Sequence, residues 1–182
     1  MSMRHSTRAR VGGFSLVEVM VALVVVSIGL LGLAKMESLA LSSTNVAGSR
    51  ALAAMEASSL ASAMHANPGY WAAGLAPGST TIYYNTSNVL QISDTGLATA
   101  ATCLTSGSGS CTTAQMAAYD VQQWANDLKS VLPSPLATVT CSTSGFPVTC
   151  TVTVQWAENA VAGNAQQTLA LAAPTYTLFV QP

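Results

Sequence analysis

Gly13-Phe14-Ser15-Leu16-Val17-Glu18 opens an apolar stretch that continues to Ala34 and decides the fold of the chain. From Phe14 to Ala34 there are 21 residues, of which one, Glu18, is ionisable. As a helix with a rise of about 1.5 Å per residue, this stretch would be roughly 31 Å long, enough to cross the core of a bilayer. A helix without a polar face must be buried in lipid or among other helices. The sequence therefore predicts a transmembrane helix over residues 14–34.

Glu18 is the unusual residue of this helix. A carboxylate inside a membrane segment costs several kcal/mol without a partner, so it indicates a functional site unless it reaches the lipid headgroups. If the chain were cut after Gly13, the new α-amine of Phe14 would be a cation at the same depth. Pairing of that amine with Glu18 has poor geometry within one helix and good geometry between two axially staggered copies. Gly29 and Gly32 lie one turn apart, where neighbouring helices can approach closely.

The motif, preceded by a short basic leader over residues 1–13, resembles the class III signal of type IV prepilins and type II secretion pseudopilins. The resemblance implies that prepilin peptidase cuts between Gly13 and Phe14, that the Phe14 amine is methylated, and that the helix packs into a filament core. It also implies that Glu18 recognises the N-terminus of a neighbouring subunit. An alternative cut of the ordinary signal-peptidase type exists at Ser38-Leu39-Ala40.

The helix is expected to continue past the membrane segment. Residues 35–66 contain no proline, and Gly48 is the one glycine among good helix formers. An apolar seam predicts packing against a globular domain through Met36, Leu39, Val46, Ala53, Ala57, Leu60 and Met64. Asn67-Pro68-Gly69 ends the helix, because proline disfavours helix at the residue before it. We therefore expect one helix over residues 14–66 and a periplasmic globular domain over residues 67–182.

The composition favours a secreted, assembled protein over a cytosolic enzyme. Charged residues make up 7% of the chain, against about 25% in ordinary soluble domains. Without Arg4, Arg8 and Arg10 of the leader, three basic residues face seven acidic ones, a net charge of −4. Arg50 and Lys129 are then the cations left for a soluble surface, so the basic patch of a nucleic-acid site is missing and no nucleic-acid partner is expected.

Charge and cysteine content predict the topology. Basic residues before the apolar stretch place the N-terminus in the cytoplasm and the rest in the periplasm or outside. Four cysteines in the exported part allow three connectivities, and we favour Cys103–Cys111 and Cys141–Cys150 because each pair closes a short, turn-rich loop. Zinc sites usually contain a tighter CxxC-type pair. We therefore expect two disulfides, as in an oxidising compartment, and no metal or cofactor.

Residues 112–132 predict a second, short helix. Thr112 or Thr113 can cap its start, and Pro133 and Pro135 end it. One face is apolar, through Ala117, Val121, Trp124, Leu128 and Val131. Trp124 is expected to anchor the core rather than to stack on a ligand. Asp120 and Asp127 are interpreted as solvated surface charges rather than a catalytic pair.

The remainder predicts loops and β-structure. Ser106–Ser110 is interpreted as a plain loop, since it lacks a phosphate-binding motif, and Asn159–Gln166 as a polar turn. Alternating, β-branched residues predict a hairpin in which Leu136–Cys141 pairs with Val148–Trp156. Two further strands are predicted over Thr80–Tyr84 and Thr175–Gln181. The fold class is therefore α+β, with a long N-terminal helix packed on a small antiparallel sheet. This order of elements is similar to the pilin architecture.

Several later stretches resemble minor pilins of the type IV pilus: residues 27–34, 64–68, 119–124, 132–133 and 152–156. The resemblance implies a structural protein that helps to initiate the pilus and is incorporated into it, in twitching motility and adhesion. Its partners would be prepilin peptidase, other minor pilins, the major pilin and a tip adhesin. It would span the inner membrane once before assembly and lie in the extracellular pilus afterwards. A minor pseudopilin of type II secretion is the close alternative.

A membrane-anchored periplasmic enzyme or binding module is the alternative from a different class. His65 is the one histidine that remains after cleavage, and it stands at a helix end without a nearby nucleophile motif. No catalytic residue is therefore assigned, and the chain is not expected to be an enzyme.

Overall fold

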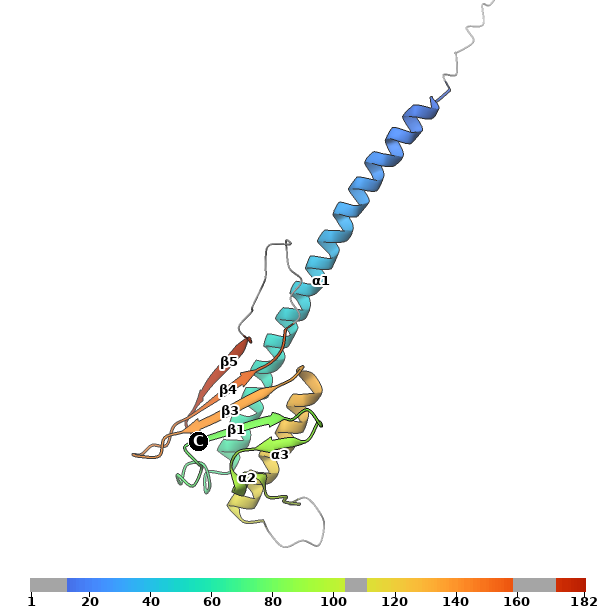
Figure 1. Cartoon of the computed structure of the whole chain (residues 1–182). Coiled ribbons are helices and arrows are strands. Elements are labelled where there is room, and N and C mark those ends of the chain that lie inside the picture. Colours follow the sequence, from blue (N-terminus) through green and yellow to red (C-terminus); the bar gives the residue numbers. More distant parts are fainter. Residues whose placement is uncertain (1–12, 104–110, 159–172) are drawn as a thin grey trace, which may run out of the picture. The chain divides into compact units, whose positions relative to one another are not determined.

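A computed structural model describes residues 13–103, 111–158 and 173–182 (Figure 1). Most of the leader, the loop Ser106–Ser110 and the polar turn Asn159–Gln166 lie outside the described residues. The chain divides into two compact units, one up to Leu41 and one from Ser42 to Pro182. The second unit thus includes the C-terminal part of the long first helix.

The long helix, α1, runs from Leu16 to Ala66 without a break, as expected. It begins at Leu16 rather than at Phe14, because the first backbone hydrogen bonds of the helix are accepted by the carbonyl oxygen of Ser15, from the N–H groups of Glu18 at 3.0 Å and Val19 at 3.3 Å. It ends before Asn67, whose side-chain amide donates to the carbonyl oxygen of Thr113 at 2.7 Å.

A five-stranded antiparallel sheet follows, in the order β2-β1-β3-β4-β5. Its strands are β1 (Ser79–Tyr84), β2 (Leu90–Ile92), β3 (Leu136–Cys141), β4 (Cys150–Gln155) and β5 (Thr175–Val180). The α+β class and the 136–155 hairpin are confirmed. The expected strand Val148–Trp156 is shorter at both ends, because pairing with β3 covers only Cys150 to Gln155. The expected last strand ends at Val180 rather than Gln181.

The core lies between one face of this sheet and two helices, the C-terminal part of α1 and α3 (Thr113–Val131), which Figure 1 shows behind the strands. The seam predicted along α1 is buried at Ala53, Ala57, Leu60 and Met64, together with Ala61. Its expected first members are not buried: Met36 is 69% exposed and Leu39 36% exposed, and Val46 is half-buried. These three residues precede the stretch of α1 that contributes to the core.

The start and the inner face of α3 follow the sequence prediction. The Thr112 hydroxyl accepts from the N–H of Gln115 at 3.2 Å, and the Gln115 side chain accepts from the N–H of Thr112 at 2.9 Å, a capping box. Trp124 is 5% exposed and packs in the core as expected, whereas Val131 is only half-buried.

Two short elements were not predicted. They are β2 and a single helical turn, α2 (Thr95–Ala98), in the segment interpreted as a long connection. The Asp94 side chain caps α2 by accepting from the N–H of Leu97 at 2.8 Å. Gln122 of α3 donates to the carbonyl oxygens of Leu97 at 2.8 Å and Thr99 at 2.9 Å, so this segment is fixed to α3.

The opposite face of the sheet carries rows of threonine. One row crosses four strands in register, through Thr81, Thr138, Thr153 and Thr177. Thr140 and Thr151 pair in an adjacent row. The hydroxyl oxygens of Thr153 and Thr177 lie 3.4 Å apart. This face is therefore uncharged in these rows, and it is polar except at Phe179, which pairs with Thr151 and is 80% exposed.

Two disulfides connect neighbouring segments of the domain. Cys141 and Cys150 are directly opposite on β3 and β4, with their Cα atoms 4.0 Å apart. Cys103 and Cys111, with Cα atoms 5.7 Å apart, join the segment after α2 to the start of α3. These are the two pairs favoured by loop length.

Candidate functional site: the N-terminal segment of α1

The candidate site consists of the non-helical residues Gly13–Ser15 and the first turns of α1. Phe14 is 84% exposed, and a Cβ added to Gly13 would meet nothing within 4 Å. The Gly13–Phe14 bond is therefore free of regular secondary structure and of side-chain cover among the described residues. Such a bond is accessible to a peptidase that must bind an extended segment.

The first half of α1 presents apolar side chains on all sides. Every large apolar residue from Leu16 to Leu33 is exposed, from 48% at Val19 to 77% at Leu16. Within the part of the chain that the structure describes, α1 alone is long and apolar enough to cross a membrane, by length and composition. An apolar surface of this extent requires a cover of lipid or of other helices.

Glu18 lies in a shallow groove along one face of this helix. The groove is lined by Phe14, Glu18, Val19, Ala22, Leu23 and Val26. Glu18 is its one ionisable side chain, and no cation among the described residues lies within ion-pair distance of it. The groove therefore places a carboxylate among apolar side chains.

Small residues continue the face that carries Glu18. At about 100° per residue, Ala22, Gly29 and Gly32 all lie within roughly 40° of Glu18 around the helix axis. An added Cβ at Gly29 or Gly32 would meet nothing within 4 Å, so this side of α1 is open to a neighbouring backbone. The hydroxyl of Ser27 donates to the carbonyl oxygen of Leu23 at 2.6 Å and is thus satisfied within the helix.

Sequence reasoning singled out Phe14, Glu18 and the two glycines but not Ala22. The signal was present, since Phe14, Glu18, Ala22 and Val26 follow one another at intervals of four residues. The structure brings Phe14 and Glu18 into one groove, whereas the four cysteines lie in the second unit and serve its fold.

The residues considered for chemistry are scattered. His65 is exposed in the last turn of α1. Asp127 is exposed as expected, but Asp120 is half-buried, and burial raises the pKa of its carboxyl above the usual value. Among residues 13–103, 111–158 and 173–182, no three His, Cys, Asp or Glu side chains gather as they would around a metal ion.

Comparison with known proteins gives one family match. Residues 8–34 match the family model described as the prokaryotic N-terminal methylation motif. Searches of curated proteins and of solved structures gave no match. The matched range contains the Gly13–Phe14 bond, Glu18 and the apolar half-helix. Together with the α+β architecture, the motif supports a pilin-like, membrane-anchored protein with a leader for prepilin peptidase and with other pilins as assembly partners.

Proposed function

We propose that this chain is a minor pilin that helps to initiate the type IV pilus and is incorporated into it, acting in twitching motility and adhesion. The N-terminal methylation motif and the helix-on-sheet fold support the pilin assignment. The short stretches at 27–34, 64–68, 119–124, 132–133 and 152–156 favour the type IV pilus modification protein PilV within that class.

The groove around Glu18 is the observation that carries the proposal. After cleavage at Gly13, Phe14 would present a methylated α-amine, a cationic group of the kind that can pair with a carboxylate. Glu18 must leave the membrane for the filament core, and an unpaired carboxylate there would cost several kcal/mol. The amine of a neighbouring subunit offsets that cost. Because the two groups meet only at one axial offset, the same contact sets the stagger between subunits.

The proposal implies an order of locations. Residues 1–13 are the leader, which the peptidase removes on the cytoplasmic side of the inner membrane. Residues 14–34 span that membrane and later pack in the filament, while the second unit faces the periplasm and then the exterior. The major pilin, other minor pilins and a tip adhesin are the proposed neighbours.

A minor pseudopilin of the type II secretion system is the second candidate, because it would use the same motif. The two candidates differ in the operon that encodes the chain. Co-location with pilus assembly genes favours the first, and co-location with secretion genes favours the second.

Replacement of Glu18 tests the assembly role. We expect Glu18→Ala to be cleaved at Gly13 like the wild type but to accumulate in the inner membrane, at least about tenfold depleted from sheared pili, since loss of a buried charge pair exceeds 1.4 kcal/mol. Glu37→Ala removes an exposed carboxylate from the same helix and is the matched control. Equal amounts of Glu18→Ala and wild type in sheared pili would disprove the register role of Glu18.

A further inference from the structure

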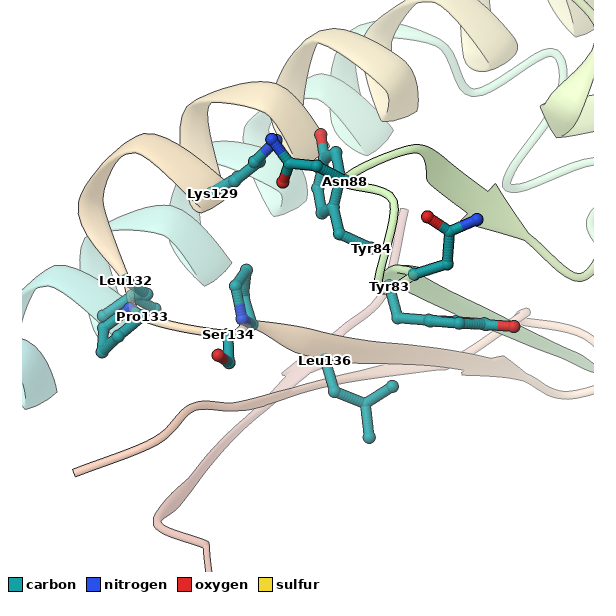
Figure 2. Close-up of a pocket in the computed structure, with 10 residues that line it drawn as sticks. Tyr83, Tyr84, Asn88, Lys129, Leu132, Pro133, Ser134 and Leu136 are labelled. Carbon is teal, nitrogen blue, oxygen red and sulfur yellow. The ribbon is translucent and has the colours of Figure 1, made fainter. Parts of the chain in front are cut away.

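A cleft of about 480 Å³ lies at the end of α3 in the second unit, with Ser134 in its lining (Figure 2). The ammonium nitrogen of Lys129 lies 4.2 Å from the centre of the Tyr84 ring there. Tyr83 pairs with Leu136 on the opposite face of the sheet, because successive side chains of a strand alternate between the faces. A lone cation beside amide and hydroxyl groups selects no class of ligand. The edge of the sheet at β5 is more selective.

The strand β5 forms an open edge of the sheet. In the order β2-β1-β3-β4-β5, β4 is its one neighbour among the described strands, and Figure 1 shows β5 at the outer side of the sheet. Its pairing with β4 covers all six residues of the strand. The edge belongs to the second unit, so what it binds is independent of the N-terminal segment and of the proposed assembly role.

The hydrogen bonds between β4 and β5 determine which backbone groups point outward. The N–H of Trp156 donates to the carbonyl oxygen of Pro174 at 3.3 Å, so these two residues form a hydrogen-bonded pair. In an antiparallel ladder such pairs alternate with pairs that share no hydrogen bond. In the register of β4 and β5, the residues whose backbone points toward β4 are then Tyr176, Leu178 and Val180. The N–H and C=O groups of Thr175, Thr177 and Phe179 therefore point away from β4, along the open edge.

This edge lacks the features that keep most sheet edges from pairing. Natural edge strands are short, or they carry charged residues, proline or a bulge. In contrast, β5 has six residues, contains neither a charge nor a proline, and pairs with β4 without a bulge. The edge strand on the other side of the sheet, β2, has three residues. The backbone of β5 is therefore available to an extended segment, the one kind of ligand that matches a row of alternating donors and acceptors.

Two prolines limit the length of the open edge. Pro174 directly precedes β5, and Pro182 follows it after Gln181. Neither proline has an N–H group to donate to a further strand. A segment that pairs here is therefore confined to the seven residues between them.

The side chains of β5 define what an added strand should carry. On the core side, Tyr176 and Leu178 are half-buried and pack against the core, so apolar surface is left uncovered at the edge. On the other side, Thr175 and Thr177 are exposed and Phe179 is 80% exposed. Aromatic and β-branched residues pair favourably across strands. A complementary strand is therefore uncharged, with apolar residues opposite Tyr176 and Leu178 and threonine-like residues on the other face.

A second copy of β5 does not suit this edge in a membrane-anchored chain. An antiparallel pair of β5 strands would relate the two copies by a twofold axis through the sheet. The C-terminal parts of α1, which lie along the back of the sheet in Figure 1, would then run in opposite directions. Two chains anchored in one membrane need helices that run in the same direction. The partner strand is therefore expected to come from a different protein.

We propose that β5 receives an extended, uncharged segment of another protein as an antiparallel sixth strand of the sheet. Three residues of that segment each donate and accept one backbone hydrogen bond, with Thr175, Thr177 and Phe179 as partners. The residues between them cover Tyr176 and Leu178 with apolar side chains.

Fluorescence polarisation with the full chain in detergent micelles tests the proposal. The probe is a labelled peptide in which three threonines alternate with three valines between two terminal lysines. We expect a dissociation constant of about 0.1–1 mM. In the antiparallel register the threonines of the probe point their N–H groups toward β5, and the valines point theirs away. Methylation of the three threonine nitrogens should thus weaken binding at least about tenfold, while methylation of the three valine nitrogens leaves it nearly unchanged.

A variant of β5 gives the matching change on the chain itself. Thr177→Pro should weaken binding of the probe at least about tenfold. Its melting temperature should stay close to that of the wild type, because the lost N–H makes no hydrogen bond to β4. Thr153→Ala removes the threonine opposite Thr177 on β4 and is the control, which should leave binding unchanged.

Amide hydrogen exchange followed by NMR needs no substitution. In the free chain, the amides of Thr177 and Phe179 should exchange at least about tenfold faster than those of Tyr176 and Leu178. Saturation with the probe should slow the exchange of the first two and leave the other two unchanged.

Three results would overturn the proposal. Unless methylation of the threonines is the more damaging of the two modifications, no antiparallel sixth strand forms. Slow exchange of the Thr177 and Phe179 amides in the free monomeric chain would show that the edge is already covered. A concentration-dependent dimer that Thr177→Pro disperses would identify a second copy as the occupant.

Discussion

The indole N–H of Trp124 donates a hydrogen bond of 2.8 Å to the backbone carbonyl oxygen of Glu56. This contact joins α3 to the C-terminal part of α1 within the core. The apolar face of α3 was predictable from helical spacing alone. The hydrogen-bond acceptor of Trp124 was not, because it lies on a different helix. The indole is buried, so its one donor needs an acceptor, and a helix carbonyl supplies it.

Removal of that hydrogen bond should destabilise the second unit. We expect Trp124→Phe to lower the free energy of unfolding by about 2–3 kcal/mol, from the lost bond and the smaller ring. Urea unfolding of the detergent-solubilised chain measures the loss. Tyr119→Phe, on the same helix, is the control and should stay within about 0.5 kcal/mol of wild type. A Trp124→Phe midpoint equal to that of the control would contradict the anchoring role.

The side chain of Glu56 should make stability depend on pH. Burial, and secondly the negative charge of Asp127, raise the pKa of this carboxyl above its usual 4.5. The folded state therefore binds more protons than the unfolded state, and stability falls as pH rises through this pKa. We expect Glu56→Gln to be more stable than wild type at pH 7, with the difference vanishing below about pH 4. Thermal unfolding across this range is the measurement.

Glu37→Gln removes an exposed carboxylate of the same helix and serves as the reference for general charge effects. A Glu56→Gln advantage that persists at pH 3, or that Glu37→Gln reproduces at pH 7, would show that titration of Glu56 is not its cause.

The two disulfides should contribute unequally. They close loops of similar length, with sequence separations of 8 and 9, so loop entropy alone gives each about 2.5 kcal/mol. Cys141 and Cys150 are also buried, at 5% and 1% exposure, and their sulfur atoms pack in the core. We expect the paired change of Cys141 and Cys150 to alanine to destabilise more than the paired change of Cys103 and Cys111. Equal losses of unfolding free energy would argue against the packing contribution.

Processing of the leader should occur after Gly13. Intact mass measurement of the membrane-bound chain is expected to show Phe14 at the N-terminus with one added methyl group. Gly13→Val should accumulate uncleaved, and because an added Cβ there has open space, its fold should be unchanged in circular dichroism. A mature chain that begins at Leu41 would show that the cut after Ala40 is used instead.

The long helix, the cap of α3 and the 136–155 hairpin were predictable because their signals are local. A continuous apolar stretch followed by good helix formers defines α1, and Thr112 with Gln115 forms a capping box within four residues. By contrast, β2 has three residues and α2 has four, too few for a period to appear. The local sequence signal for α2 was one capping residue, Asp94.

The sheet order and the cleft depend on contacts between distant segments. Tyr83 pairs with Leu136 across more than fifty residues, and nothing near either residue indicates that register. The positive φ of Ser134 was not predictable either, since Pro135 favours the opposite conformation. The N-terminal groove needed no such contacts, because its lining follows from helical spacing alone.

The threonine rows across β1, β3, β4 and β5 determine how fast this face can meet another molecule. Their side chains carry no charge, so these rows add no steering of their own to the unsteered association rate of about 10⁵–10⁶ M⁻¹s⁻¹. Added salt has no attraction to screen at these rows themselves. Each hydroxyl can donate or accept. The incoming molecule therefore determines whether each threonine hydroxyl acts as donor or as acceptor.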